Sequence, residues 1–434
     1  MKQLENLSKF TEKLLIEFRN NRALFIFWNS LILGFFLLPL GINISTPFMI
    51  ISMAMGALLA FKRRQIIDFK DLAILCFPLL FLMMALSLLY TTNWPNGLSL
   101  LSRSVPFFLF PIIFLFVKED KTIIRKLFAA LAFGLMLSFL INIYGAFENS
   151  IILEAGSIKF DTSVNGGYSF IESFDHGGSY FVGGDLSKHV HPSYISLYIL
   201  LVIIYLRITI HNKKKYVVIA CLVLYLFLLA SRASIFIFLL LLVLNIFYTA
   251  NKVQIRNRIV MLLIAAVVFL VMNPRMQVFY ERLEDFTHKE NYNYTTSEQS
   301  RILIYNSCLQ LIKKAPIYGY GVGDVNEILL NKYIELGYHK HIEDKYNAHN
   351  QYFQTYLQVG LAGVIFLTLP FVLIYVRHRN LAVASLLLVF VVSLIFESML
   401  IRYNGIIIFS IIIPMLLRYD QVFKRLINFK KIEE

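Results

Sequence analysis

Charged residues are scarce in this chain: they make up 16% of its 434 residues, whereas 58% are hydrophobic. Soluble domains are roughly half apolar and about a quarter charged, so this composition excludes a soluble globular protein and indicates an integral membrane protein. The interiors of the apolar runs carry Asn29, Asn142 and Asn245 but essentially no ionisable side chain. A transporter or flippase would need such side chains along its pathway, and that class is therefore disfavoured.

Cysteine is also rare. Cys76, Cys221 and Cys308 lie far apart without CxxC spacing, and two of them fall inside apolar runs. This pattern argues against a disulfide framework or a thiolate metal site and favours small buried side chains. We also expect no cleavable signal, because residues 1–22 mix basic and acidic residues and no small-x-small site follows the first apolar run. We expect residues 1–23 to form an amphipathic cytoplasmic lead-in.

The chain instead contains a series of apolar stretches. Each is close to the length of about 17–25 residues that lets a helix cross a bilayer. We predict twelve, at 24–40, 45–61, 72–90, 104–117, 126–146, 192–210, 215–230, 233–249, 257–273, 351–376, 380–397 and 403–418. The pairs 215–230/233–249 and 380–397/403–418 are nearly continuous. Whether each pair is one span or two is decided by the distribution of charge.

Segments rich in Lys and Arg alternate along the chain with segments that have few of them. With the N-terminus inside the cell, 27 of the 41 Lys and Arg residues fall in cytoplasmic segments, and merging either close pair would reverse every later loop. Lys and Arg retained inside set the orientation of a membrane protein. We therefore predict an all-α integral membrane protein with about twelve transmembrane helices and both termini cytoplasmic. The formal net charge of +14 then reflects topology and not a surface for nucleic acid.

This topology divides the chain into five parts. They are the lead-in at 1–23, transmembrane helices one to nine at 24–273 with a Gly-rich periplasmic loop at 147–190, a large periplasmic loop at 274–350, transmembrane helices ten to twelve at 351–418, and a cytoplasmic tail at 419–434. The glycines of the 147–190 loop suggest a flexible, lid-like segment.

The large loop between helices nine and ten carries helical signals. Apolar residues recur at helical spacing from Ile302 to Ile312 and again from Val325 to Leu336. The second helix is preceded by Asp324 with Glu327 three residues on, a variant of the capping box. The glycines at 319, 321 and 323 predict a tight connector between the two helices. They do not form a phosphate-binding P-loop, because no strand precedes them and no Gly-Lys-Ser/Thr follows.

We expect Arg103, Arg232 and Arg402 at short turns on the outer side. These positions are unusual, because Lys and Arg are normally retained on the cytoplasmic side. An arginine at the end of a span costs energy unless it snorkels to water or finds a partner. Arg402 could pair with Glu397, or the arginines could be interfacial anchors. Three on one side argue for an external anion, and the planar guanidinium suits phosphate. Arg301, at the start of the first loop helix, is a fourth candidate or a solvated charge.

A histidine ends the large loop. His349 precedes Asn350, which we predict to be the N-cap of the next helix. A neutral imidazole at the membrane edge can act as a general base near neutral pH, and the alternative is a loop histidine bonded to the backbone. His189 and His191, with Asp175, His176 and Asp185, lack a recognised metal-ligand spacing. The His191-Pro192 pair marks the entry to a helix.

Between residues 190 and 410 the order of these features resembles the O-antigen ligase family, which includes related O-antigen polymerases and some protein O-oligosaccharyltransferases. The features that carry the resemblance are Ser231-Arg232, Arg301 followed by Pro316 and Gly319/Gly321/Gly323, His349-Asn350 with Gly360 and Gly363, and Glu397 with Arg402 and Gly405. The resemblance implies a GT-C-like inner-membrane glycosyltransferase of lipopolysaccharide biosynthesis that acts on the periplasmic face.

The resemblance also implies the chemistry. The donor would be an undecaprenyl-diphosphate-linked glycan within the membrane lipids, and the acceptor a lipid A-core or another glycan, with no metal, no cofactor and no nucleic acid. His349 would be the base of an inverting transfer, and Arg232, Arg301 and Arg402 would bind the diphosphate. Asn350, Glu397, His191 and Arg103 would support them. The alternatives are an O-antigen polymerase, a polysaccharide transporter and a non-catalytic scaffold.

Overall fold

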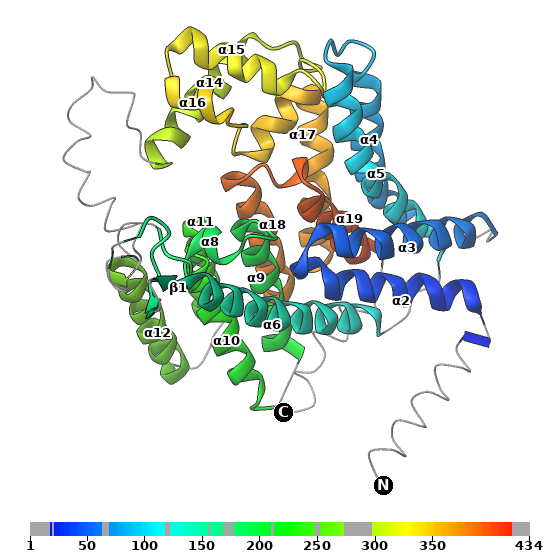
Figure 1. Ribbon diagram of the computed structural model, residues 1–434. Helices are drawn as coiled ribbons and strands as arrows, with labels where there is room; N and C mark the ends of the chain where they lie inside the picture. Colours follow the sequence, from blue (N-terminus) through cyan, green and yellow to red (C-terminus); the bar gives the residue numbers. More distant parts are fainter. Residues whose placement is uncertain are drawn as a thin grey trace.

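The structure is a computed structural model (Figure 1). It describes residues 18–19, 21–62, 69–117, 122–154, 157–166, 168, 173, 178–209, 212–247, 252–272 and 297–418. Most of the predicted lead-in, the first part of the large loop up to 296, the tail at 419–434, and Asp175 and His176 lie outside these residues. Helices dominate the described part, which confirms the predicted helical fold class.

The helices fall into two groups on either side of the large loop. Before it lie α2 (Arg22–Leu37), α3 (Ile42–Lys62), α4 (Cys76–Ser87), α5 (Trp94–Phe116), α6 (Ile123–Ser150), α8 (Gly183–Leu186), α9 (Pro192–Thr209), α10 (Lys215–Leu228), α11 (Arg232–Phe247) and α12 (Lys252–Met272). Within and after it lie α14 (Ser297–Lys314), α15 (Val325–Leu336), α16 (His339–Asp344), α17 (Gln351–Arg377), α18 (Leu381–Phe396) and α19 (Tyr403–Arg418). Short 3-10 segments are η1 (Leu38–Leu40), η2 (Phe69–Leu75) and η4 (Met399–Ile401).

Each predicted apolar stretch overlaps one helix. Among the described residues, six helices are long and apolar enough to cross a membrane and five apolar helices are shorter, so the chain is a multi-pass membrane protein. The two nearly continuous pairs are separate helices, divided by residues 229–231 and by η4. One predicted boundary was wrong: α5 starts at Trp94, not near 104, because its polar first turns resemble a loop in the sequence.

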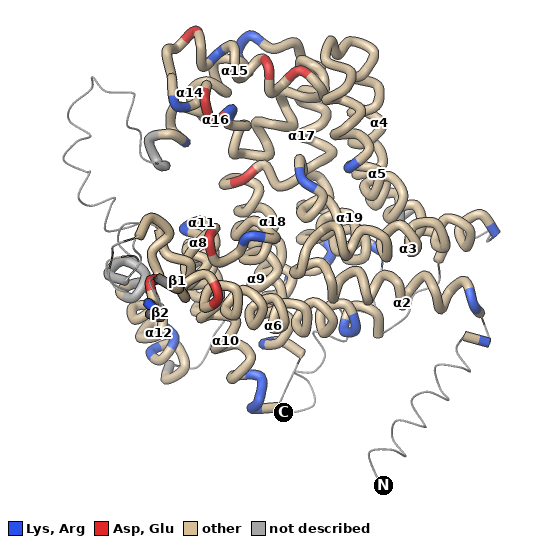
Figure 2. Tube along the Cα trace, in the orientation of Figure 1, with Lys and Arg blue, Asp and Glu red and all other residues tan. Residues whose placement is uncertain are grey.

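The apolar helices share one continuous core, within which nearly every side chain of α9 and α19 is buried. α2 packs along α3 and α6, and α19 packs along α5 (Figure 1). Basic residues gather at the start of α2, the end of α3 and the starts of α6 and α10, on the lower and right-hand side of Figure 2. The opposite helix ends, at the start of α17 and the end of α6, adjoin the two long loops.

A second, smaller core holds the large loop together above these helices. It includes Ile304 and Cys308 of α14, Leu329 and Tyr333 of α15, and Leu357 of α17. Burial raises the pKa of the Cys308 thiol to about 12, so this cysteine stays neutral within the core. The described part of the loop is therefore a packed helical cap.

α17 is broken in the middle, a feature that the sequence analysis did not predict. Val359 and Gly360 leave helical geometry, and Gly360 has φ +70°. The connector before α15 fills the gap in hydrogen bonding: the N–H of Tyr320 donates to Leu357 O (2.7 Å), and the N–H of Leu361 donates to Ile317 O (3.1 Å). The first turns of α17 thus belong to the cap, and a broken helix inside a membrane protein is stable only where such partners exist.

The predicted connector and the second loop helix are both present, but the predicted capping box is wrong. Asp324 is at the N-cap position of α15, yet its side chain makes no cap hydrogen bond there. Its carboxylate instead accepts the N–H groups of Thr92 (2.9 Å) and Asn93 (2.7 Å). Asp324 therefore anchors the cap to the turn between α4 and α5.

The described part of the Gly-rich loop at 147–190 is more structured than a flexible lid. Strands β1 (Ile151–Glu154) and β2 (Ser157–Phe160) form an antiparallel hairpin after α6, with Ile151 opposite Phe160. An isolated bridge joins Ser163 to Ser179, and α8 follows. This loop ends at His191, directly before α9, and so delivers that histidine to the outer end of the helix core.

Candidate active site

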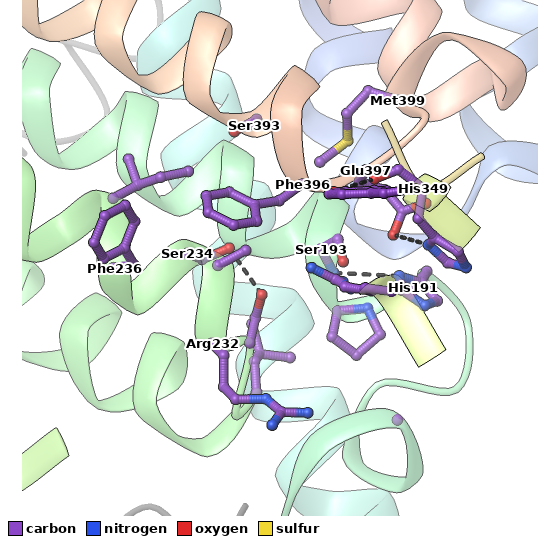
Figure 3. Close-up of a pocket in the computed structure, with 18 of the residues that line it drawn as sticks. His191, Ser193, Arg232, Ser234, Phe236, His349, Ser393, Phe396, Glu397 and Met399 are labelled. Carbon is purple, nitrogen blue, oxygen red and sulfur yellow. Dashed lines mark hydrogen bonds and ion pairs between the residues drawn. The ribbon is translucent and has the colours of Figure 1, made fainter. Parts of the chain in front are cut away.

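A cavity of about 650 Å³ opens between the cap, the starts of α9 and α11 and the end of α18. This volume lies within the range of about 300–1,000 Å³ that is typical of ligand-binding sites. Its polar lining includes His191, Arg232, Arg301, Tyr305, His349 and Glu397. In Figure 3, His191, His349 and Glu397 form one group, and Arg232 lies on another wall near Ser234. Five segments far apart in the sequence therefore meet here.

The backbone of His349 is held in an unusual conformation. Its φ of 43° lies in the left-handed region, which non-glycine residues seldom adopt. The N–H of His349 donates to Asn347 Oδ1 (2.8 Å), and its carbonyl accepts the hydroxyl of Tyr305 (3.2 Å). As predicted, Asn350 caps α17, accepting the N–H of Phe353 (3.1 Å). Strained residues that are fixed in this way are frequent at functional sites.

The imidazole of His349 is oriented by Glu397. Nδ1 lies 3.2 Å from Glu397 Oε2, and the two side chains are 22% and 13% exposed. An ionised carboxylate can only accept a hydrogen bond, so Nδ1 carries the proton. In the neutral ring, Nε2 then keeps a free lone pair. A carboxylate that holds a histidine in one tautomer is the usual support for general-base chemistry.

Glu397 is kept ionised by its surroundings. Burial would raise the pKa of this carboxyl, but the hydrogen bond from His349 and the charges of His349, His191 and Arg301 together hold it below its ordinary value. A pair between Glu397 and Arg402 was one expectation from the sequence. Within the described residues no such ion pair is found, and the partner of Glu397 is His349.

Tyr305 was not expected to have a role at the site, because its position suggested only an apolar face of a loop helix. Its hydroxyl lies 3.2 Å from the carbonyl of His349 and 2.9 Å from that of Ile395, and the single proton is shared between them. The ring packs edge-on against Phe353, with the centroids 5.5 Å apart. Tyr305 thus joins α14, the His349 turn and the end of α18. No sequence pattern could have revealed this bridge.

Two arginines line the cavity, one from α11 and one from α14. Arg232 is the first residue of α11 and follows Ala230, which has φ 47°. The hydroxyls of Ser231 and Ser234 lie 2.9 Å apart and brace this turn. Arg301 is in the second turn of α14. Residues 231–234 also bring the positive end of the α11 dipole to the cavity. Guanidinium groups and a helix N-terminus together favour an anionic ligand such as phosphate.

Some of the other predicted residues line this cavity and some do not. His191 lines the cavity, with Nδ1 accepting the N–H of Ser193 (3.3 Å). Arg103 and Arg402 do not line it. They line a separate, smaller cavity, and Arg103 is in the third turn of α5, not at a short turn as expected. No group of three potential metal ligands occurs among the described residues.

Comparison with known families adds a separate observation. Residues 216–368 match the model of the family described as O-antigen ligase. The match covers less than half of the chain. The matched region runs from α10 into the second half of α17 and contains Arg232, Arg301 and His349. His191 and Glu397 come from either side of the matched region. No curated protein matches the chain.

Proposed function

We propose that this chain is a metal-independent membrane glycosyltransferase that moves an undecaprenyl-diphosphate-linked glycan onto a lipid A-core acceptor. The observation that carries the proposal is the cavity in which His349, held by an ionised Glu397, lies with Arg232 and Arg301. These groups fit the two needs of glycosyl transfer from a diphosphate, which are a base for the acceptor and cations for the leaving group. The match of residues 216–368 to the O-antigen ligase model agrees with this chemistry.

The reaction proceeds by direct displacement. Nε2 of His349 takes the proton of an acceptor hydroxyl, and that oxygen forms a bond to the anomeric carbon of the donor. The bond from this carbon to the diphosphate oxygen breaks, its electron pair leaves with the diphosphate, and the anomeric configuration inverts. Arg232 and Arg301 stabilise the growing negative charge, and the imidazolium then releases its proton to water. The ionised carboxylate of Glu397 stabilises the imidazolium while it exists.

The proposal includes an orientation in the membrane. The twelve apolar helices would each cross the bacterial inner membrane, with both termini in the cytoplasm and the cavity at the periplasmic face. Support comes from the basic residues at the starts of α2, α6 and α10 and at the end of α3, which lie away from the cap (Figure 2). Lys and Arg are retained on the cytoplasmic side. A donor lipid would then reach the cavity from the outer leaflet.

The acceptor is tested by reconstitution. The purified chain is incubated with lipid-linked glycan and either a lipid A-core acceptor or further lipid-linked repeat units, and the products are resolved by mass spectrometry. We expect glycan on the lipid A-core. Products extended only on the lipid-linked carrier would replace this assignment with a polymerase, which shares the donor chemistry. Movement of the donor across vesicle membranes by a His349→Ala variant would instead favour a transporter.

A further inference from the structure

A second cavity, of about 170 Å³, lies on the other side of η4 from the candidate active site. The segment from Glu397 to Arg402 separates the two: Glu397 and Met399 line the larger cavity, and Ile401 and Arg402 line the smaller. The side chain of Gln351 braces this wall, because its Oε1 accepts the N–H of Leu400 (2.7 Å). The second cavity is lined mainly by polar side chains: Asn96, Ser99, Arg103, Asn326, Gln354, Gln358 and Arg402.

Two exposed guanidinium groups meet at this cavity from distant parts of the chain. Arg103 comes from α5, where its Nη2 donates to Ser99 Oγ (2.8 Å), and Arg402 precedes α19. Within the described residues, neither arginine forms an ion pair with a carboxylate. Asp324 adjoins the lining residue Gly323, but its oxygens accept backbone N–H groups from the α4–α5 turn. The cavity therefore carries positive charge, which favours an anion that accepts several hydrogen bonds at once.

A buried amide gives a second and independent indication of a ligand. Gln354 is 2% exposed and lines the cavity, and its Oε1 has no hydrogen-bond partner. Gln358, one turn later, is 3% exposed. An unpaired buried amide oxygen costs free energy that a donor in the cavity would recover. A phosphate ester that also carries hydroxyl groups supplies both acceptors for the arginines and a donor for Gln354.

We propose that this second cavity is a binding site for the phosphoryl group of a hydroxyl-bearing phosphate ester, separate from the catalytic pocket. The volume accommodates a single small polar headgroup. Two sources have this chemistry: the headgroup of a membrane lipid, which would enter beside α5 and α19, and a soluble sugar phosphate. The site does not depend on the transfer reaction proposed above, and it can be tested by binding alone.

The test is calorimetric titration of the full-length protein in a non-ionic detergent. Three compounds are titrated: dihexanoyl phosphatidylglycerol, glucose 1-phosphate and inorganic phosphate. We expect saturable binding of at least one of the two hydroxyl-bearing esters, with weaker binding of inorganic phosphate. Arg402→Gln and Arg103→Gln each lower the affinity about tenfold, as expected for the loss of a charge-assisted hydrogen bond. Tighter binding of the phospholipid identifies a lipid headgroup, and tighter binding of glucose 1-phosphate a soluble ester.

Matched variants locate the site. Arg232→Gln removes a guanidinium from the larger cavity and should leave this binding unchanged. Gln354→Met keeps the size of the buried side chain but removes its amide, and it should reduce the preference for the hydroxyl-bearing esters over inorganic phosphate. No saturable binding of any of the three compounds would overturn the proposal. Equal loss of affinity in Arg232→Gln and Arg402→Gln would also overturn it, because the ligand would then occupy the catalytic pocket.

Discussion

The imidazole of His349 and the carboxylate of Glu397 lie 3.2 Å apart, although they come from the start of α17 and the end of α18. The charges around Glu397 hold its pKa below the ordinary value, so that the pair joins an ionised acid to a histidine at neutral pH. Orientation of the ring through Nδ1 leaves Nε2 for chemistry. The base of the proposed transfer is therefore Nε2 of His349.

Glu397→Gln keeps the shape of the side chain but removes its charge. We expect kcat to fall about ten- to a hundredfold, which corresponds to the loss of one hydrogen bond to a charged group. KM for the donor should change little, because Glu397 acts through His349. The measurement is steady-state transfer with varied donor. A wild-type kcat would show that the pair has only a structural role.

The same pair predicts how stability depends on pH. The pKa of Glu397 in the folded protein is lowered. Its ionised form therefore adds fully to the free energy of unfolding above the unfolded pKa of about 4.3. This stabilisation is lost as the pH falls through the folded pKa. The wild type should therefore exceed Glu397→Gln in thermal stability at pH 7, and the difference should shrink below about pH 4. Thermal unfolding in detergent from pH 7 to pH 3 measures this. A difference that stays constant or grows at acid pH would contradict the account.

Arg232→Lys keeps the positive charge but replaces a planar fork with a point charge. We expect transfer to fall about tenfold if Arg232 binds the diphosphate through two hydrogen bonds, because an ammonium group cannot reproduce that geometry. Arg379→Lys, at an exposed position just before α18, is the matched control and should retain full activity. Wild-type turnover of Arg232→Lys would argue against a two-pronged contact.

The break in α17 requires a residue without a side chain at position 360, which is Gly360. It has φ +70°, and an added Cβ would overlap the carbonyl of Ile317 in the connector. Gly360→Ala should therefore lower the free energy of unfolding by more than about 3 kcal/mol. Gly337 has φ +72° but open space around it, and Gly337→Ala should cost only about 1–2 kcal/mol. Equal costs, measured by thermal unfolding, would remove the contact with Ile317 from the explanation.

Sequence alone predicted the helices well because apolar runs in a membrane have few alternatives to helix. It failed where polar residues belong to a helix, as in the first turns of α5, and this failure misplaced Arg103. The break at Gly360 was also missed, since it is stabilised by a connector some 40 residues earlier. Local patterns do not contain such distant partners.

The candidate site was only partly predictable from sequence. The predicted topology puts Arg232, Arg301 and His349 on one side of the membrane, and all three line one cavity. The choice of partner for Glu397 could not be predicted, because His349 and Arg402 are both close in the sequence-based topology and only packing decides between them. Tyr305 resembled an ordinary helix-packing residue. Its two carbonyl partners exist only in the folded chain.

Single-turnover transfer by His349→Gln tests the central claim most directly. Gln keeps a polar side chain at the position but cannot accept the proton, so the rate of the chemical step should fall by about 10²–10⁴-fold. Binding of the lipid-linked donor, measured in the same preparation, should remain within about twofold of the wild type, since the diphosphate contacts are assigned to arginines. A chemical step at the wild-type rate in His349→Gln would contradict the account.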